Sequence, residues 1–196
     1  MKKMVGMMMV LAFALAAPMT FAEEGEKPTK EEKKKATKQE ERDEINKVAD
    51  EALAEVLKDA PKANELFEKA EGWAVFDNLR VTFILTGGGG SGVAVNKASG
   101  KRTYMKMGTG GIAFGIGAQK YQVIMFFDSE ERLNNFIEKG WKAETGANAA
   151  AGTAGANAGT AFIDGIAVYQ ITEAGLMASA DVSGTKYSYD KKLNED

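Results

Sequence analysis

Carboxylates and basic side chains are the groups with which this chain of 196 residues could do chemistry, because it contains neither His nor Cys. Ser–His and Cys nucleophiles are therefore excluded, and so are metal sites built from thiolates or imidazoles. Two carboxylates roughly 5–9 Å apart can hydrolyse a glycoside, and Glu144, Asp164 and Asp181 are the residues to consider. Nothing around them indicates a sugar site, so we predict a protein that is not an enzyme and has no catalytic residues, metal or cofactor.

Runs of glycine raise the possibility of a phosphate-binding loop. Gly87 and Gly92 have the spacing of a P-loop, but Val93 stands where that loop needs Lys. The glycines of 108–117 do not form the G-x-G-x-x-G pattern of dinucleotide sites. Within strands, glycine permits bulges, sharp coiling and close approach of another backbone. We therefore interpret the glycines as determinants of a strongly curled or barrel-like sheet.

A basic stretch is the strongest indication of a binding surface. From Asn78 to Phe127 the chain has no Asp or Glu, and the candidate lipid-binding residues are the six cations of this stretch: Arg80, Lys97, Lys101, Arg102, Lys106 and Lys120. Near an anionic membrane each such cation contributes ~1 kcal/mol. The alternative is that they are ordinary solvated residues matched by acids on the helices.

The N-terminus has the layout of a secretory signal peptide. Lys2 and Lys3 precede an uncharged, apolar run, and Thr20-Phe21-Ala22 resembles a cleavage site. We predict a signal peptide over 1–22, cleaved near Ala22, and a periplasmic or secreted protein that is not a lipoprotein. An uncleaved anchor is the alternative. Without the two signal lysines the net charge is −5, which argues against nucleic acid as a partner.

The remaining pattern predicts one α+β domain over 45–190, between a charged tail or frayed helix at 23–44 and a polar tail at 191–196. Apolar residues at helical spacing predict an amphipathic helix from Ile45 to about Lys58, and Pro61 fits the start of a second. Asp128 is the expected N-cap of a further short helix. Strands are expected at 73–76, 80–85, 93–95, 102–107, 112–117, 121–127, 161–172 and 176–185. The expected fold is therefore N-terminal amphipathic helices packed on a strongly curled, Gly-rich, mainly antiparallel sheet or barrel-like sheet, with one further short helix.

The order of these motifs resembles the SYLF family from roughly Asp43 to Thr185. The motifs that carry the resemblance are Ala70–Asn78 (AEGWAVFDN), Gly87–Val93, Gly108–Gln119, the apolar strand Val123–Phe127, Leu133 with Phe136, and Gly175-Leu176. Asp77 and Gln122 depart from the family, which usually has Pro and an acidic residue there. The resemblance implies lipid binding. Eukaryotic members bind phosphoinositides, some yeast relatives bind actin, and bacterial members occur as exported, stand-alone domains.

We therefore expect a non-catalytic, exported protein that binds phospholipid, anionic in particular, at the bacterial envelope. Its expected partner is a phospholipid or membrane surface. The alternative is a structural or interaction protein of the periplasm with no lipid ligand and an unknown protein partner.

Overall fold

The computed structural model describes residues 30–143, 161–173, 175–177 and 185–195. The predicted signal peptide, Glu144 and Asp181 lie outside the described residues. The described elements, in chain order, are α1 (Lys30–Asp59), α2 (Pro61–Lys69), β1 (Gly72–Asn96), β2 (Arg102–Phe127), α3 (Glu130–Lys139), β3 (Trp141–Ala143), β4 (Ile166–Thr172), β5 (Gly175–Met177), β6 (Thr185–Tyr189) and α5 (Lys191–Asn194).

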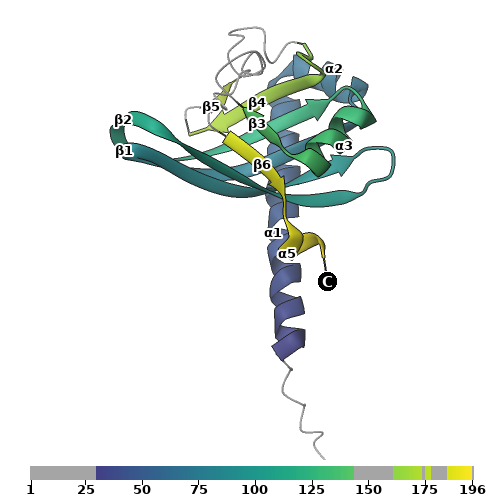
Figure 1. The fold of residues 1–196 in the computed structure, drawn as a ribbon. Coiled ribbons are helices and arrows are strands. Elements are labelled where there is room, and N and C mark those ends of the chain that lie inside the picture. The colour runs from purple at the N-terminus through teal and green to yellow at the C-terminus, as the bar shows by residue number, and fades with distance from the viewer. Residues whose placement is uncertain (1–29, 144–160, 174, 178–184, 196) are drawn as a thin grey trace, which may run out of the picture.

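The two N-terminal helices pack on the sheet with their apolar side. On α1, Ala49 and Val56 lie on the predicted face and are buried, and Pro61 opens α2 as predicted. α1 begins at Lys30, well before the first apolar residue of that face at Ile45. Its charged first half extends beyond the sheet (Figure 1), where the Arg42 guanidinium donates to a backbone carbonyl of α5 at 2.8 Å.

The two later helices are short and each buries a leucine. α3 starts at Glu130 with Ser129 in the N-cap position, one residue after the predicted cap Asp128. Its Leu133 is fully buried. Residues 191–194, expected within a polar tail, form α5, and Leu193 inside it is fully buried.

One long hairpin makes up most of the sheet. The short strands predicted between 73 and 127 join into β1 of 25 residues and β2 of 26, paired antiparallel from Gly72↔Phe127 to Val95↔Arg102. The register shifts once, between Phe83 and Leu85. The glycine run at 87–90 therefore does not end a strand. It continues β1, because Gly has no side chain to clash when the strand bends.

Close contact between the two halves of β1 explains why glycine recurs at every second position there. A Cβ at Gly90 would overlap the carbonyl oxygen of Asp77, and a Cβ at Gly92 would overlap that of Val75. A Cβ at Gly88 would overlap the carbonyl oxygen of Leu79, also in the first half. The strand thus folds back against itself where only glycine fits, which is the close approach expected of these glycines.

The sheet is antiparallel and open. Its strands run in the order β3-β6-β2-β4-β5, and β1 pairs with β2 on that strand's other edge. The α+β class is confirmed, but the expected barrel-like closure is wrong and the expected strong curl is confirmed only in part. The reason is that β4 and β6 pair with the two ends of β2 rather than continuing around to β1.

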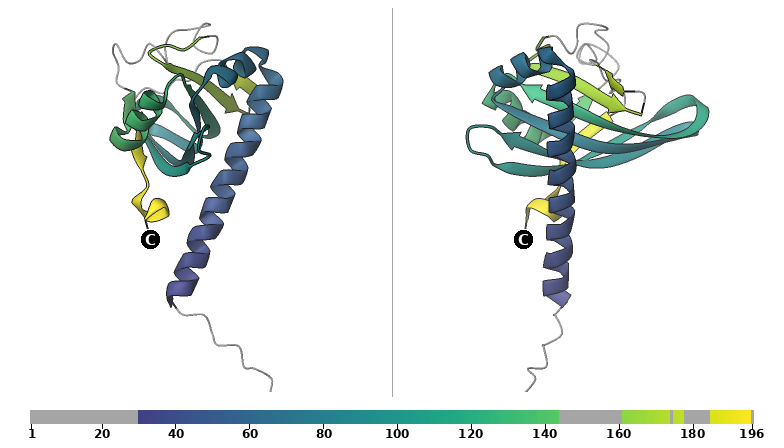
Figure 2. Two further views of the ribbon diagram at one scale, coloured as in Figure 1. Left: turned by 90° about the vertical axis from the view of Figure 1, so that its right-hand side faces the viewer. Right: turned by 180° about the vertical axis from the view of Figure 1, so that it is seen from behind.

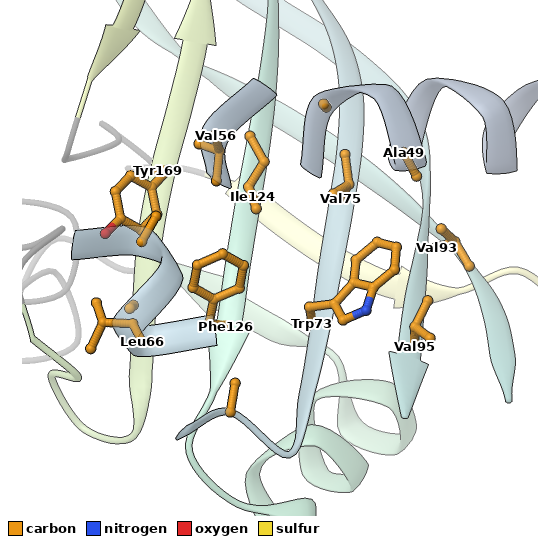
Figure 3. Close-up of a cluster of buried hydrophobic side chains, with 14 of the residues drawn as sticks. Ala49, Val56, Leu66, Trp73, Val75, Val93, Val95, Ile124, Phe126 and Tyr169 are labelled. Carbon is orange, nitrogen blue, oxygen red and sulfur yellow. The ribbon is translucent and has the colours of Figure 1, made fainter. Parts of the chain in front are cut away.

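Helices cover both faces of the sheet, and each face has its own core (Figure 2). We call the face toward α1 and α2 the outer face. Figure 3 shows its core, in which Trp73, Ile124 and Phe126 of the sheet meet Val56 and Leu66 of the helices. The opposite, inner face packs on α3. Its core contains Phe76, Val123, Phe127, Leu133, Phe136 and Tyr187.

Candidate functional site

A two-stranded part of the β1–β2 hairpin projects from the body of the molecule. It consists of residues 79–87 of β1 and 110–120 of β2, which we call the wing (Figure 1). β4 pairs with β2 only from Tyr121 onward, and β6 pairs with it only as far as Thr109. Among the described strands, β1 and β2 are therefore paired only with each other in the wing, and each has one open edge.

Three described apolar side chains on the outer face of the wing are exposed to solvent. Leu79, Val81 and Ile116 continue the alternation that places Val75 under α1, yet they are 44%, 49% and 82% exposed. Among the described residues only Tyr189, at the end of β6, is a further large exposed hydrophobic side chain. The apolar face that α1 and α2 cover in the body thus extends beyond them into solvent.

Two of the predicted site cations lie at the base of the wing. Lys120 is opposite Leu79 in the register and is exposed. Arg80 lies on the inner face and is half-buried, with its guanidinium carbon 5.1 Å from the centroid of the Tyr121 ring. The wing therefore has an apolar outer face bordered by a lysine, and an arginine behind it.

Two other predicted cations are engaged with the helices at the opposite end of the hairpin. The Lys97 ammonium donates to the carbonyl of Phe67 at 2.6 Å, at the C-terminal end of α2. Arg102 forms an ion pair with Asp50 of α1 at 2.8 Å, and its guanidinium lies over the Trp73 ring. These contacts fix the helices on the outer face, so both cations have a role within the fold.

The last two predicted cations lie elsewhere. Lys101 is exposed next to the hairpin turn. The Lys106 ammonium is 3.1 Å from the carboxylate of Asp190, which is buried and caps α5. The structure therefore does not gather the six cations into one surface. Lipid contact by any of them remains a prediction.

Other candidate chemistry finds little support in the described part of the chain. Asp164 lies in a turn before β4 with φ of 50° and lines a hollow together with Arg132 and Lys139. No group of three acidic residues there could hold a metal ion. A hollow between α1 and β1 is lined by Glu41, Glu44 and Asp77, which does not suit an anionic ligand. No described helix has the length and apolar character needed to cross a bilayer.

The sequence predicts strands at the wing but not the exposure of one face. The odd-numbered residues from Leu79 to Leu85 are apolar, and such alternation is the usual pattern of a strand with one covered face. What distinguishes the wing is that none of the described helices covers that face, and this becomes visible only in the assembled fold.

Comparison with known proteins places part of this architecture in a family. Residues 108–196 match the family described as Ysc84: Las17-binding protein actin regulator, the SYLF family, and this match includes the β2 half of the wing. The chain is also 42% identical over 151 residues to a protein of Aeromonas veronii named beta cell expansion factor A. That alignment covers 77% of this chain and 58% of the relative. The predicted SYLF resemblance is confirmed.

Proposed function

We propose, from the premise that residues 108–196 are of the SYLF family, that this protein binds phospholipid membranes peripherally and without catalysis, through the outer face of the wing. The observation that carries the proposal is the uncovered apolar side chains of Leu79, Val81 and Ile116. Removing apolar surface from water contributes about 25 cal/mol per Å². A bilayer surface supplies the apolar contact that α1 and α2 supply in the body.

The open edges of the wing limit how deeply it enters the bilayer. Among the described strands, neither β1 nor β2 has a second partner there. Unpaired backbone N–H and C=O groups are costly in hydrocarbon, so open edges are not found within it. We therefore expect the wing to lie along the interface, with its apolar face toward the acyl chains and its edges in the hydrated headgroup region.

Charge favours an anionic surface as the partner. Lys120 borders the apolar face, and long lysine side chains can extend to the headgroups while their methylenes lie on apolar surface. Each cation near an anionic surface contributes about 1 kcal/mol. Within the wing itself, residues 79–87 and 110–120, the sequence has no carboxylate to oppose this attraction. The predicted signal peptide would place the protein at the bacterial envelope, so we propose no actin binding.

Liposome flotation tests the proposal. Vesicles of phosphatidylcholine alone and with phosphatidylglycerol are mixed with the protein and with the double variant Val81→Ser/Ile116→Ser. We expect the native protein to float with vesicles, more so with phosphatidylglycerol, and the variant to stay at the bottom. Tyr189→Ser, which removes an exposed hydrophobic residue outside the wing, is the matched control and should float as the native protein does.

The result that would reject the proposal is flotation of the double variant equal to that of the native protein. Failure of the native protein to float with either vesicle would reject it as well. The second outcome would favour the interaction protein that the sequence left open, because open strand edges are also where a partner protein can add a strand.

A further inference from the structure

A hollow of about 490 Å³ lies where α3 and the beginning of β3 meet the turn that precedes β4. Four residues of α3 line it, namely Arg132, Asn135, Phe136 and Lys139, and Trp141 of β3 forms a further wall. Arg132 and Lys139 are exposed, so the hollow is open to solvent. Pockets for small molecules typically measure about 300–1,000 Å³. We call this hollow the α3 hollow, and it has both the space and the access that a small organic ligand needs.

Backbone and ring contacts hold two walls of the α3 hollow in place. In the turn before β4, the backbone N–H of Ile163 donates to the carbonyl of Ile166 at 3.0 Å, and the reverse hydrogen bond measures 3.1 Å. The two residues between them have positive φ angles of 50° and 80°, as in a tight two-residue hairpin turn. The Trp141 ring stacks on Tyr187, with the ring centroids 5.8 Å apart. The α3 hollow is therefore formed before any ligand arrives.

Two cations that line the α3 hollow lack an ion-pair partner in the described part of the chain. They are Arg132 and Lys139, three residues before and four residues after Asn135, so all three lie on one side of α3. Their long side chains can converge on a group at Asn135, whose amide is a further donor. Asp164 is the one carboxylate among the residues given as the lining, which leaves a net charge of +1. The charge therefore favours a ligand with a single anionic group.

The rest of the lining is apolar and partly aromatic. Phe136 is buried beneath the α3 hollow, whereas Trp141, Ile163 and Ile166 are half-buried and leave part of their surface open to it. Covering such apolar surface contributes about 25 cal/mol per Å². Aromatic rings also gain from offset or edge-on contact with a second ring. A ligand that fits these walls has a flat, apolar ring attached to its anionic group.

We propose that the α3 hollow binds a small aromatic monocarboxylate. Its carboxylate lies at Asn135 and accepts charge-assisted hydrogen bonds from Arg132 and Lys139, while its ring lies against Trp141. This site goes beyond the proposed membrane function and does not depend on it. The α3 hollow is on the side of the sheet that packs on α3, whereas the wing meets the membrane with its outer face, so the two can be tested separately.

The two tryptophans of the chain allow a test that also locates the ligand. Trp141 lines the α3 hollow, whereas Trp73 is buried in the outer core. The probe is 2-naphthoate, with 2-naphthylmethanol as the uncharged comparison, and Trp141→Phe assigns the two indole N–H signals in the NMR spectrum of labelled protein. We expect 2-naphthoate to shift the Trp141 signal saturably and to leave the Trp73 signal in place. By calorimetry, 2-naphthylmethanol should bind at least about tenfold more weakly, since it makes no charge-assisted hydrogen bond.

Arg132→Gln/Lys139→Gln is the informative variant, and Lys47→Gln/Lys58→Gln on α1 is the control with the same loss of charge. The first should weaken 2-naphthoate binding at least about tenfold, while an unchanged Trp73 signal shows that it is folded. The control should bind 2-naphthoate as the native protein does, and so should the wing variant Val81→Ser/Ile116→Ser.

The proposal is overturned if 2-naphthoate leaves the Trp141 signal unshifted, or if Arg132→Gln/Lys139→Gln binds it as tightly as the native protein. Binding of 2-naphthylmethanol as tight as that of 2-naphthoate would overturn it as well, because the cations would then contribute nothing. Failure of vesicle flotation has no bearing on these outcomes, since the probe is a free solute.

Discussion

Graded serine substitutions along the wing give the sharpest prediction. Ile116, Val81 and Leu79 are 82%, 49% and 44% exposed, so they have different amounts of apolar surface left to bury in a membrane. Full burial of such a side chain contributes about 2 kcal/mol. Scaled by exposure, Ile116→Ser should cost about 1.6 kcal/mol of membrane affinity, Val81→Ser about 1.0 and Leu79→Ser about 0.9.

These costs translate into measurable partition coefficients, because about 1.4 kcal/mol is a factor of ten in an equilibrium constant. Ile116→Ser should weaken partitioning into vesicles containing phosphatidylglycerol about 15-fold, and the other two about 4- to 5-fold. The assay is titration with vesicles followed by sedimentation, with far-ultraviolet circular dichroism to confirm folding. Equal effects at the three positions, or a larger loss at Leu79 than at Ile116, would refute the reasoning.

Three further predictions concern stability, each measured by urea unfolding followed by tryptophan fluorescence. Gly92→Ala should destabilise the fold by about 1–3 kcal/mol, because its Cβ would overlap backbone. Gly87→Ala, with nothing near its Cβ, should be neutral or slightly stabilising, and equal stability of the two variants would contradict the account. Burial raises the pKa of Tyr169 from 10 to about 12, so the stability it contributes is complete below pH 10 and is lost as pH rises to 12. The unfolding free energy should fall by at most about 1.4 kcal/mol per pH unit. Tyr169→Phe should make this fall with pH less steep. An unchanged pH dependence in the variant would exclude Tyr169 as the source of the loss. Arg102→Ala should cost more than Asp50→Ala, because Arg102 loses the contact with an aromatic ring as well as the ion pair; the reverse order would show that the ring contact contributes nothing.

Helix positions could be predicted from the sequence where periodicity is strong. Ala49, Ala52 and Val56 recur at helical spacing and are buried on α1 as expected. The start of that helix could not be predicted, because residues 30–44 are charged and have no apolar face to show a period. What holds them is α5, more than 140 residues away, through Arg42 and through the ion pair of Lys192 with Glu41.

The contacts between residues that are far apart in the chain could not be predicted from the sequence. The alternation at Leu79 and Val81 predicts a strand but is identical for covered and uncovered faces. The six cations are contiguous in an acid-free stretch, yet a long hairpin separates Arg80 from Arg102 because β1 and β2 run the length of the sheet. Asn78 and Tyr187 are far apart in the sequence, and only the folding back of β1 and the pairing of β6 with β2 bring them toward each other.

The most direct test of membrane binding by the wing uses the absence of Cys from the chain. Ile116→Cys in the wing and Ser99→Cys in the turn at the far end of the hairpin each provide a single site for an environment-sensitive fluorophore. On addition of vesicles containing phosphatidylglycerol, we expect a blue shift and increased intensity at position 116 and no change at position 99. A response at position 99 with none at position 116 would contradict the account.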